Sequence, residues 1–322
     1  MRLIKQSYKL IGTPINLEEA WQLAEKAYRN CYQSLPKDPT LSSEKWCRKF
    51  LNHNANPDMD HMSPLEFGAV YLMGDLRKDA SLKHLFEKYK SNPYSRVFYD
   101  VYYDIFYVTT NLRVILENKW EDDLQYATFP HKNHILFVAF QAYCALQVYK
   151  DCRTHRTTSW AVESTRFCNY AKDKFGNELT FALLPDMVNE YPVLNSYCYK
   201  SLDEDTLKGL YYDISESEVR KYSELAIYLG GMYDAEQRYL QLINDYHWTP
   251  QMAAKRLPQD TAAHVIFGGY EDSLNHMFML RAAELSGPVD PMVKEVMYPL
   301  WQDYRDFIFN MKNENISVNV TN

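Results

Sequence analysis

The sequence has no long basic run and no long apolar run. Its 35 Lys and Arg residues are outnumbered by 42 Asp and Glu residues, so the formal net charge is −7. General nucleic-acid binding requires concentrated positive charge, which this sequence lacks. A local anion-binding pocket is still compatible with the composition. The opening residues MRLIK do not begin an apolar stretch long enough for a signal peptide or a membrane span. We therefore expect neither a nucleic-acid nor a membrane partner.

Cysteine is scarce and is not arranged in pairs. The chain has six cysteines, and none of them forms a C-x-x-C motif. The common zinc-ligand spacings are absent for the same reason, so we expect no metal site. Unpaired thiols are typical of a reducing compartment. The sequence therefore predicts free cysteines and a cytoplasmic location.

Several signatures of nucleotide-dependent and hydrolytic enzymes are also missing. The chain has no Gly-rich phosphate loop, no Walker motif, no nucleophile elbow and no internal repeat. With 322 residues, 46% hydrophobic and 24% charged, it is globular and long enough for a substantial core. The 27 Tyr residues suit wet clefts and subunit interfaces, although the composition of the lineage would explain them equally well.

Hydrophobic periodicity predicts helices at both ends of the chain and strands between them. The expected helices are 17–32, 42–51, 219–245, 250–256, 261–285 (with a possible kink at Gly268-Gly269) and 291–309. The expected strands are an edge strand within 1–15, then 99–110, 135–140 and 178–184. Residues 201–219 are acidic and indicate a surface excursion, and 313–322 indicate a mobile polar tail. The sum is one α/β or α+β domain over residues 1–312.

The segment 154–167 (THRTTSWAVESTRF) gathers side chains that bind anions. Arg156 and Arg166 each offer several N–H donors to a phosphate or a carboxylate. The other hydrogen-bonding side chains of the segment include His155, Thr157, Ser159, Glu163 and Ser164. If the segment is helical, both arginines share one side with Ser159 and Glu163. A solvated face with Arg–Glu pairs and an anion-binding site are both compatible with this pattern.

The segment HMSPLEF at 61–67 is a second candidate. Ser63 stands before Pro64, and Glu66 follows three residues later, which is the pattern of a capping box at the start of a helix. His61 precedes the positive end of that helix, where an anion could bind. A capping role for Ser63 and Glu66 therefore competes with a binding role.

The segment 154–167 resembles the signature of the flavin-dependent thymidylate synthases (ThyX), R-H-R-x-x-S-x-N-E-x-S-x-R-Y. The matching residues are His155, Arg156, Ser159, Ser164 and Arg166, and Phe167 stands in place of the Tyr. The sequence departs from the signature at Thr154, Ala161 and Val162, where the family has Arg, Asn and Glu. Glu163 supplies a carboxylate one position later. The resemblance is that of a divergent branch.

Further elements resemble the same family in the same order along the chain. They are 61–66 (H-x-S-x-x-E), 107–113 (a strand-to-helix N-L-R element), 235–239 and 250–258 (the long helix and its P-x-x-A turn) and 276–281 (a late helix ending in Arg). Ala254 replaces the Arg of the turn, and Tyr270 and Asp272 replace the usual Asn and Arg of the late helix. The flavin-free thymidylate synthases need a Cys nucleophile after Pro. No Cys follows Pro in this sequence.

The resemblance implies a fold with a central mixed or antiparallel sheet flanked by long helices, and a homotetramer that binds FAD and dUMP between subunits. It implies reductive methylation of dUMP to dTMP by methylenetetrahydrofolate, with FAD as hydride carrier and NADPH as reductant. Because of the departures from the family pattern, two alternatives stay open. The enzyme could act on another uracil nucleotide such as UMP, or the chain could be an inactive nucleotide-binding or assembly protein.

The resemblance also assigns roles to individual residues. It assigns FAD binding to His61, Ser63, Glu66, His155, Arg156, Thr157, Ser159 and His276. It assigns dUMP binding to Asp151, Glu163, Ser164, Thr165, Arg166 and Arg281. Arg281 is expected to be catalytic, because its charge would stabilise the negative charge that develops on the uracil ring. The structural alternatives are a helix-terminal role for Arg281, core packing for His276 and a local Arg partner for Glu163.

Overall fold

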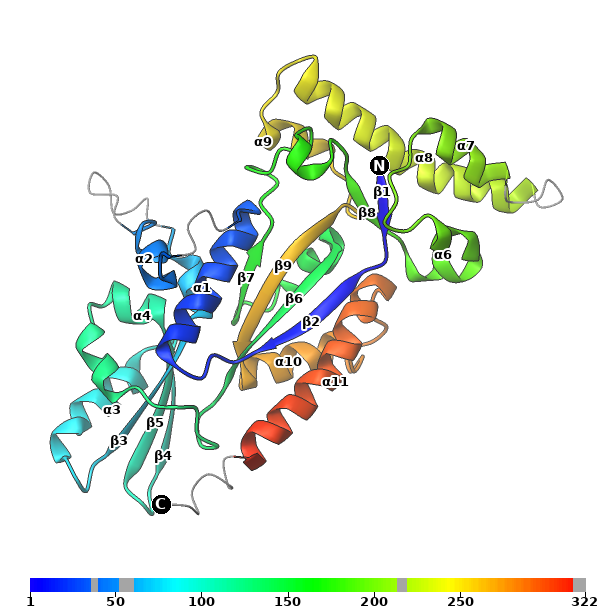
Figure 1. Cartoon of the computed structure of the whole chain (residues 1–322). Coiled ribbons are helices and arrows are strands. Elements are labelled where there is room, and N and C mark those ends of the chain that lie inside the picture. Colours follow the sequence, from blue (N-terminus) through cyan, green and yellow to red (C-terminus); the bar gives the residue numbers. More distant parts are fainter. Residues whose placement is uncertain (36–39, 52–60, 213–218, 315–322) are drawn as a thin grey trace.

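A four-stranded antiparallel sheet lies at the centre of the protein, whose computed structural model describes residues 1–35, 40–51, 61–212 and 219–314 (Figure 1). Its strands, in spatial order, are β2 (Ser7–Gly12), β6 (Phe137–Ala145), β9 (Ala262–Tyr270) and β7 (Thr158–Val162). β6 pairs with β9 along its full length, from Phe137 opposite Tyr270 to Ala145 opposite Ala262. The predicted α/β class, with an antiparallel central sheet and flanking helices, is confirmed.

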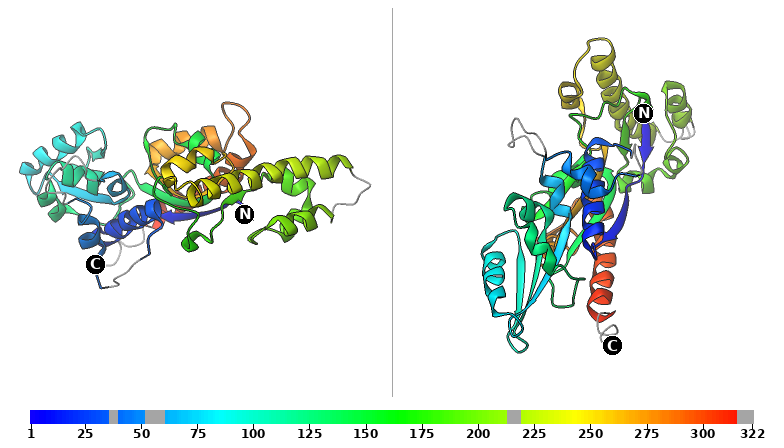
Figure 2. Two further views of the ribbon diagram at one scale, coloured as in Figure 1. Left: turned by 90° about the horizontal axis from the view of Figure 1, so that it is seen from above. Right: turned by 60° about the vertical axis from the view of Figure 1, so that its left-hand side comes forward.

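Two smaller sheets accompany the central one. The three-stranded antiparallel sheet has the order β3 (Ala69–Asp75), β5 (Ile105–Asn111) and β4 (Arg96–Asp100). The other is a parallel pair of β1 (Arg2–Ile4) and β8 (Thr180–Ala182). Figure 2 shows that the molecule is elongated, with the three-stranded sheet at one end and helices α7 and α8 at the other.

The helices pack against these sheets. α1 (Leu17–Tyr32) contacts β7 and β9, whereas α11 (Pro291–Glu314) contacts β2 and β6. α10 (Glu271–Arg281) follows β9 directly. The other helices are α2 (Ser43–Arg48), α3 (Lys83–Ser91), α4 (Leu112–Glu117), α5 (Leu146–Cys152), α6 (Pro185–Glu190), α7 (Glu204–Tyr212), α8 (Val219–Asn244) and α9 (Pro250–Ala253). Within the described ranges, no helix has the length and apolar character needed to cross a membrane.

The predicted long helices are confirmed where local signals are strong. α1 begins at the predicted residue because the Asn16 side chain accepts a hydrogen bond from the Glu19 N–H. α8 buries Leu225, Leu229 and Met232, one turn apart, as the periodicity indicates. α11 also forms, and it continues through Glu314, two residues into the predicted tail.

Two predictions fall partly on residues that are not described. Of the acidic segment 201–219, residues 213–218 lie outside the described chain, and α7 forms most of the rest. Residues 315–322 of the tail also lie outside it. Apolar clusters surround the central sheet, the three-stranded sheet and α8. That residues 1–312 form one domain stays a prediction.

The predicted helix at 261–285 is wrong in its first half, which forms strand β9. Nearly every residue of β9 is buried, because β6 and β7 flank the strand and helices α1, α5 and α10 pack against it. Such a strand reads as a continuous apolar run without alternation, and periodicity alone does not separate it from a buried helix. Gly268 is not a helix kink, because it lies within strand β9. A Cβ at this position would lie 2.9 Å from the Val138 carbonyl oxygen. This glycine allows close approach of β6 and β9.

Two other expectations are corrected. The segment 154–167 is not helical, because its centre is strand β7 and turns flank it. The single strand expected at 99–110 is a hairpin of β4 and β5. The chain reverses through Asp104, whose φ is 54°, and Asp100 accepts hydrogen bonds from the backbone N–H groups of Tyr102 and Tyr103. Asp side chains stabilise turns in this way.

Candidate functional site

A cavity of about 340 Å³ is lined by residues of both the three-stranded and the central sheet. Its charged and polar lining includes Glu66, Arg96, Arg113, Glu117, Arg156, Thr157 and Ser159. Its aromatic lining is Tyr94, Phe137 and Tyr270. Four residues predicted to bind FAD, namely Glu66, Arg156, Thr157 and Ser159, therefore line one cavity.

Glu66 joins three elements at this cavity. One carboxylate oxygen accepts a hydrogen bond from Arg113 Nη1 at 2.5 Å, and the other accepts one from Ser159 Oγ at 2.6 Å. Arg113 Nε also donates to Glu117 at 2.8 Å. These contacts connect the 3₁₀ helix Ser63–Phe67 to α4 and β7.

The capping-box interpretation of Ser63 and Glu66 is therefore wrong. The segment forms a 3₁₀ helix whose N-cap is Met62, without a side-chain cap. The Ser63 hydroxyl lies 3.1 Å from His61 Nε2 instead. The carboxylate of Glu66 accepts hydrogen bonds from Arg113 and Ser159 and does not cap the start of the helix.

A second group of predicted residues gathers around Arg281, at the end of α10. Arg281 donates from Nε to His155 Nε2 at 3.2 Å and from Nη2 to Thr154 Oγ1 at 3.3 Å. The rings of His155 and His276 meet edge to face at 5.7 Å. Burial, followed by the charges of Arg281 and His276, lowers the pKa of His155. His155 is therefore kept neutral, as its role as acceptor for Arg281 requires.

Asp151 belongs to the same group. Its carboxylate accepts a hydrogen bond from Gln147 at 2.9 Å, and its carbonyl oxygen accepts one from Thr154 Oγ1 at 2.7 Å. His276 is exposed, so the alternative of a histidine packed in the core is wrong. The side-chain contacts of Arg281 go to the loop before β7.

A third group lies at the other end of β7. The turn after the strand closes when the Ser164 carbonyl accepts hydrogen bonds from the N–H groups of Phe167 and Cys168. Within the described chain, the backbone N–H groups of Thr165 and Arg166 have no protein acceptor. Consecutive free N–H groups in a turn form an anion-binding site. That this turn binds the phosphate of dUMP stays a prediction.

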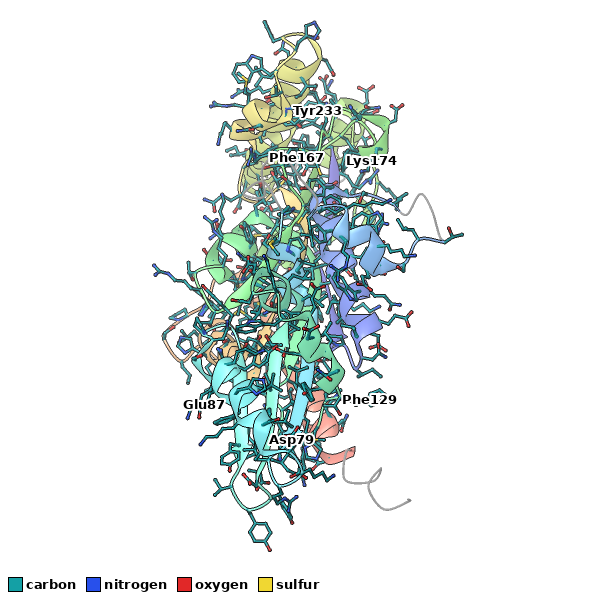
Figure 3. All side chains as sticks on the ribbon, turned by 90° about the vertical axis from the view of Figure 1, so that its left-hand side faces the viewer. Asp79, Glu87, Phe129, Phe167, Lys174 and Tyr233 are labelled. Carbon is teal, nitrogen blue, oxygen red and sulfur yellow. The ribbon has the colours of Figure 1, made fainter. Side chains whose placement is uncertain are left out.

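His61 lies near this turn and not in the cavity. The His61 Nδ1 is 3.1 Å from the Tyr32 hydroxyl, and the Tyr32 ring lies 5.5 Å from the Phe167 ring. The Arg166 guanidinium stands 5.5 Å over the Phe167 ring. Lys174 donates to the Tyr32 carbonyl at 3.3 Å, and Figure 3 shows Lys174 and Phe167 in the same part of the molecule.

Glu163 points into the protein. It is 4% exposed and accepts hydrogen bonds from the Tyr170 hydroxyl at 2.8 Å and from the His264 N–H at 3.2 Å. Burial raises the pKa of this carboxyl group. The alternative of a local pairing with Arg156 or Arg166 is wrong, and a direct contact with dUMP stays a prediction that the burial of Glu163 does not favour.

The sequence of one family matches the region that carries most of these residues. Residues 133–286 match the family model described as "Thymidylate synthase complementing protein". The matched segment is just under half of the chain. His61, Ser63 and Glu66 lie outside it, as do the cavity residues Tyr94, Arg96, Arg113 and Glu117. The resemblance seen in the sequence is confirmed over this segment.

Curated proteins and solved structures were also compared with this chain. A search of curated proteins gave no significant match. Among solved structures, the chain is similar to the UMP/dUMP methylase PolB from Streptomyces cacaoi bound with 5-Br UMP, with 13% identity and a TM-score of 0.37, covering 99% of this chain and 96% of that chain. It is also similar to thymidylate synthase X from Helicobacter pylori with FAD and dUMP, with 13% identity and a TM-score of 0.34, covering 96% and 98%. TM-scores this low do not establish a shared fold.

Within a single chain, the residues predicted to bind FAD and dUMP do not all lie at one site. Ser159 at the cavity and Ser164 in the turn after β7 are five residues apart along extended chain, which corresponds to about 16 Å. The Arg281 group lies beside the start of β7, whereas Arg166 follows its end. The residues predicted for FAD and for dUMP are thus each divided between two places in the chain.

The structure also adds cavity residues that sequence reasoning missed. Arg113 belongs to the N-L-R element, so a signal for it existed, but its role was not inferred. Arg96 and Tyr94 lie in the β4 region and enter the cavity only through the fold. Within the described ranges, no group of three or more His, Cys, Asp or Glu side chains is placed to hold a metal ion.

Proposed function

We propose that this protein is an FAD-dependent thymidylate synthase, a methyltransferase that converts dUMP to dTMP with methylenetetrahydrofolate as the one-carbon donor and NADPH as the reductant. The observation that carries the proposal is the meeting of Glu66 with Arg156, Thr157 and Ser159 at one cavity. Glu66 and Ser159 are 93 residues apart in sequence, yet they share a hydrogen bond. The family match over residues 133–286 supports the same reaction.

The chemistry of the cavity lining fits a flavin dinucleotide. Arg96, Arg113 and Arg156 offer guanidinium donors to phosphate groups. The rings of Tyr94 and Tyr270 offer faces on which a flavin or an adenine could stack. A volume of about 340 Å³ is at the lower end of small-molecule sites, so a dinucleotide would extend beyond the cavity.

In this proposal, bound FAD supplies the hydride, and the protein positions and polarises the substrate. Arg281 would face the uracil ring and stabilise negative charge on it. His155 accepts a hydrogen bond from Arg281 Nε and thereby fixes the direction of the guanidinium. The free N–H groups of Thr165 and Arg166 would bind the dUMP phosphate, and the Arg166 guanidinium would add charge.

The division of predicted residues along β7 supports a site shared between copies. We propose a homotetramer in which one chain contributes the Ser164–Arg166 turn and another contributes Arg281 to each dUMP site. Mixing two inactive variants tests this arrangement. Arg166→Ala and Arg281→Ala should each be inactive alone, and hybrids refolded together should recover part of the activity. A mixture that stays inactive, although hybrids form, would contradict a shared site.

The reaction itself is tested with purified protein supplied with FAD. We expect a flavin spectrum that NADPH bleaches and that dUMP with methylenetetrahydrofolate restores, with dTMP as the product. Turnover of UMP but not dUMP would point to another uracil nucleotide. No flavin uptake from excess FAD would refute the enzymatic proposal and favour a non-catalytic binding protein.

The six free cysteines are compatible with a reducing cytoplasmic compartment.

Arg281 provides the sharpest single-residue test. Arg281→Ala should abolish turnover while the protein keeps its flavin, because the proposed role of Arg281 is toward the uracil ring. Arg238 on α8 is exposed and lies outside the cavity lining and the Arg281 group, so Arg238→Ala is the matched control and should keep wild-type turnover. Unchanged turnover in Arg281→Ala would refute the assigned role.

A further inference from the structure

Arg96 is a cavity residue to which neither the family signature nor the predicted site assigns a role. Its Nε donates to Asp272 Oδ2 at 2.8 Å. Its Nη1 donates to the carbonyl oxygens of Pro93 and Ser95 at 3.3 and 3.1 Å. The guanidinium lies 4.8 Å over the ring of Tyr270. The side chain is therefore held from three directions while it lines the cavity.

This arrangement leaves one nitrogen for a ligand. Within the described residues, Arg96 Nη2 has no protein acceptor, since Asp272, Pro93 and Ser95 accept hydrogen bonds only from Nε and Nη1. A guanidinium whose other nitrogens are already fixed loses little conformational entropy when it binds a phosphate oxygen. Arg96 is thus preorganised as an anion donor.

The partner of Arg96 can yield to a stronger anion. The side chain of Asp272 is 51% exposed and that of Arg96 is 21% exposed. An ion pair so close to solvent contributes little to stability, so a phosphate group with its higher charge can share or displace this contact at small cost. The same carboxylate places a negative charge beside the position that a phosphate would occupy, and it lowers the affinity for anions there.

We propose that Arg96 recognises the phosphate groups of the ligand in the cavity, and that Asp272 orients Arg96 and limits its affinity for phosphate. The proposal rests on the proposed function, because it takes the ligand to be a flavin dinucleotide. It makes Arg96 one of the residues that distinguish FAD from riboflavin, which has the same ring system without phosphate. The ring of Tyr270 stabilises the guanidinium of Arg96 through a cation–π contact.

The test is a titration of flavin-free protein with FAD and with riboflavin, followed by flavin fluorescence. Arg96→Gln should weaken FAD binding by about ten-fold or more and leave riboflavin binding unchanged, because a charged hydrogen bond to phosphate is lost. Asp272→Asn keeps Arg96 and should tighten FAD binding at low ionic strength. This gain should shrink as salt screens the charges.

Matched controls use an exposed ion pair of the same residue types on α8. Arg238 and Asp234 lie 3.5 Å apart with side chains 71% and 67% exposed. Arg238→Gln changes the net charge by the same amount as Arg96→Gln, and Asp234→Asn by the same amount as Asp272→Asn. Both control variants should alter neither FAD nor riboflavin binding. They separate a local contact from a general effect of protein charge.

The outcomes distinguish failure of this inference from failure of the proposed function. If Arg96→Gln weakens FAD and riboflavin equally, or neither, Arg96 does not recognise phosphate. If Asp272→Asn weakens FAD binding, Asp272 does not limit the affinity. If wild-type protein binds neither flavin, the proposed function fails, and titration with inorganic pyrophosphate still tests Arg96. Loss of pyrophosphate binding in Arg96→Gln would then support phosphate recognition, and unchanged binding would refute it.

Discussion

The buried carboxylate of Glu163 allows a quantitative test of how the turn after β7 is held in place. Glu163 accepts hydrogen bonds from the Tyr170 hydroxyl and from the His264 N–H. Glu163→Ala removes the acceptor for the buried Tyr170 hydroxyl and for the partly buried His264 N–H. Tyr170 follows the turn after β7, and His264 lies in β9, so the substitution removes contacts on both sides of that turn.

The expected cost follows from these two contacts. A buried donor left without a partner costs about 1–3 kcal/mol. Two such donors give about 2–6 kcal/mol, from which the relief of burying a carboxylate is subtracted. We therefore expect Glu163→Ala to lower the free energy of unfolding by about 2–4 kcal/mol at pH 7. Glu163→Gln should cost less, because its amide can accept from His264 and donate to a reoriented Tyr170 hydroxyl.

The pH dependence has a definite sign. Burial raises the pKa of Glu163 in the folded protein above its unfolded value. The stability associated with this group is fully present below the unfolded pKa of about 4.3, and it is lost as pH rises through the folded pKa. Glu163→Gln does not titrate. The stability of wild type relative to Glu163→Gln should therefore increase as the pH is lowered from 7 toward 4.3.

Urea denaturation followed by circular dichroism measures these differences at several pH values. Glu87, which is exposed on α3, provides a matched control, and Glu87→Ala should change the unfolding free energy by less than about 0.5 kcal/mol. The reasoning would be refuted by a Glu163→Ala protein as stable as the control. If the stability of wild type relative to Glu163→Gln fell as the pH was lowered, burial would not destabilise the carboxylate.

Two further outcomes test other parts of the structure. Only Cys31 and Cys198 of the six cysteines are not fully buried, and burial raises the pKa of Cys31 to about 11. At most two thiols should therefore react with a thiol reagent in the native protein at pH 8 and all six after denaturation; more than two native reactions would contradict the buried positions. Asn30→Ala should cost about 1–2 kcal/mol in denaturant unfolding, because the buried amide donates to the Ala161 and His264 carbonyl oxygens and ties α1 to the central sheet. A neutral effect would show that this tie contributes nothing.

The candidate site could be predicted in part because some of its residues stand together in the sequence. The signature-like segment contains Arg156 and Ser159, and the structure places both at the cavity. Glu66 was also predicted, but its partners were not, because Arg113 and Ser159 reach it from elements distant in the chain. Arg96 could not be predicted, since only the packing of the two sheets brings it to the cavity.

The sequence by itself determined the helices with local signals. Helices 17–32, 219–245 and 291–309 were predicted because an apolar face repeats every turn, and the structure contains α1, α8 and α11 there. The chemistry of the segment 154–167 was also visible, since charged and hydroxyl side chains crowd into few residues. These properties depend only on neighbours along the chain.

Only the tertiary structure decided which apolar run is a central strand and where each polar side chain points. β9 is a strand because β6 and β7 pair with its two edges, while helices α1, α5 and α10 pack against it. The direction of Glu163 is set by β9 and Tyr170, and not by the arginines beside it in the sequence. Hydrogen bonds between distant residues form only when the fold brings them together, so local patterns do not contain them.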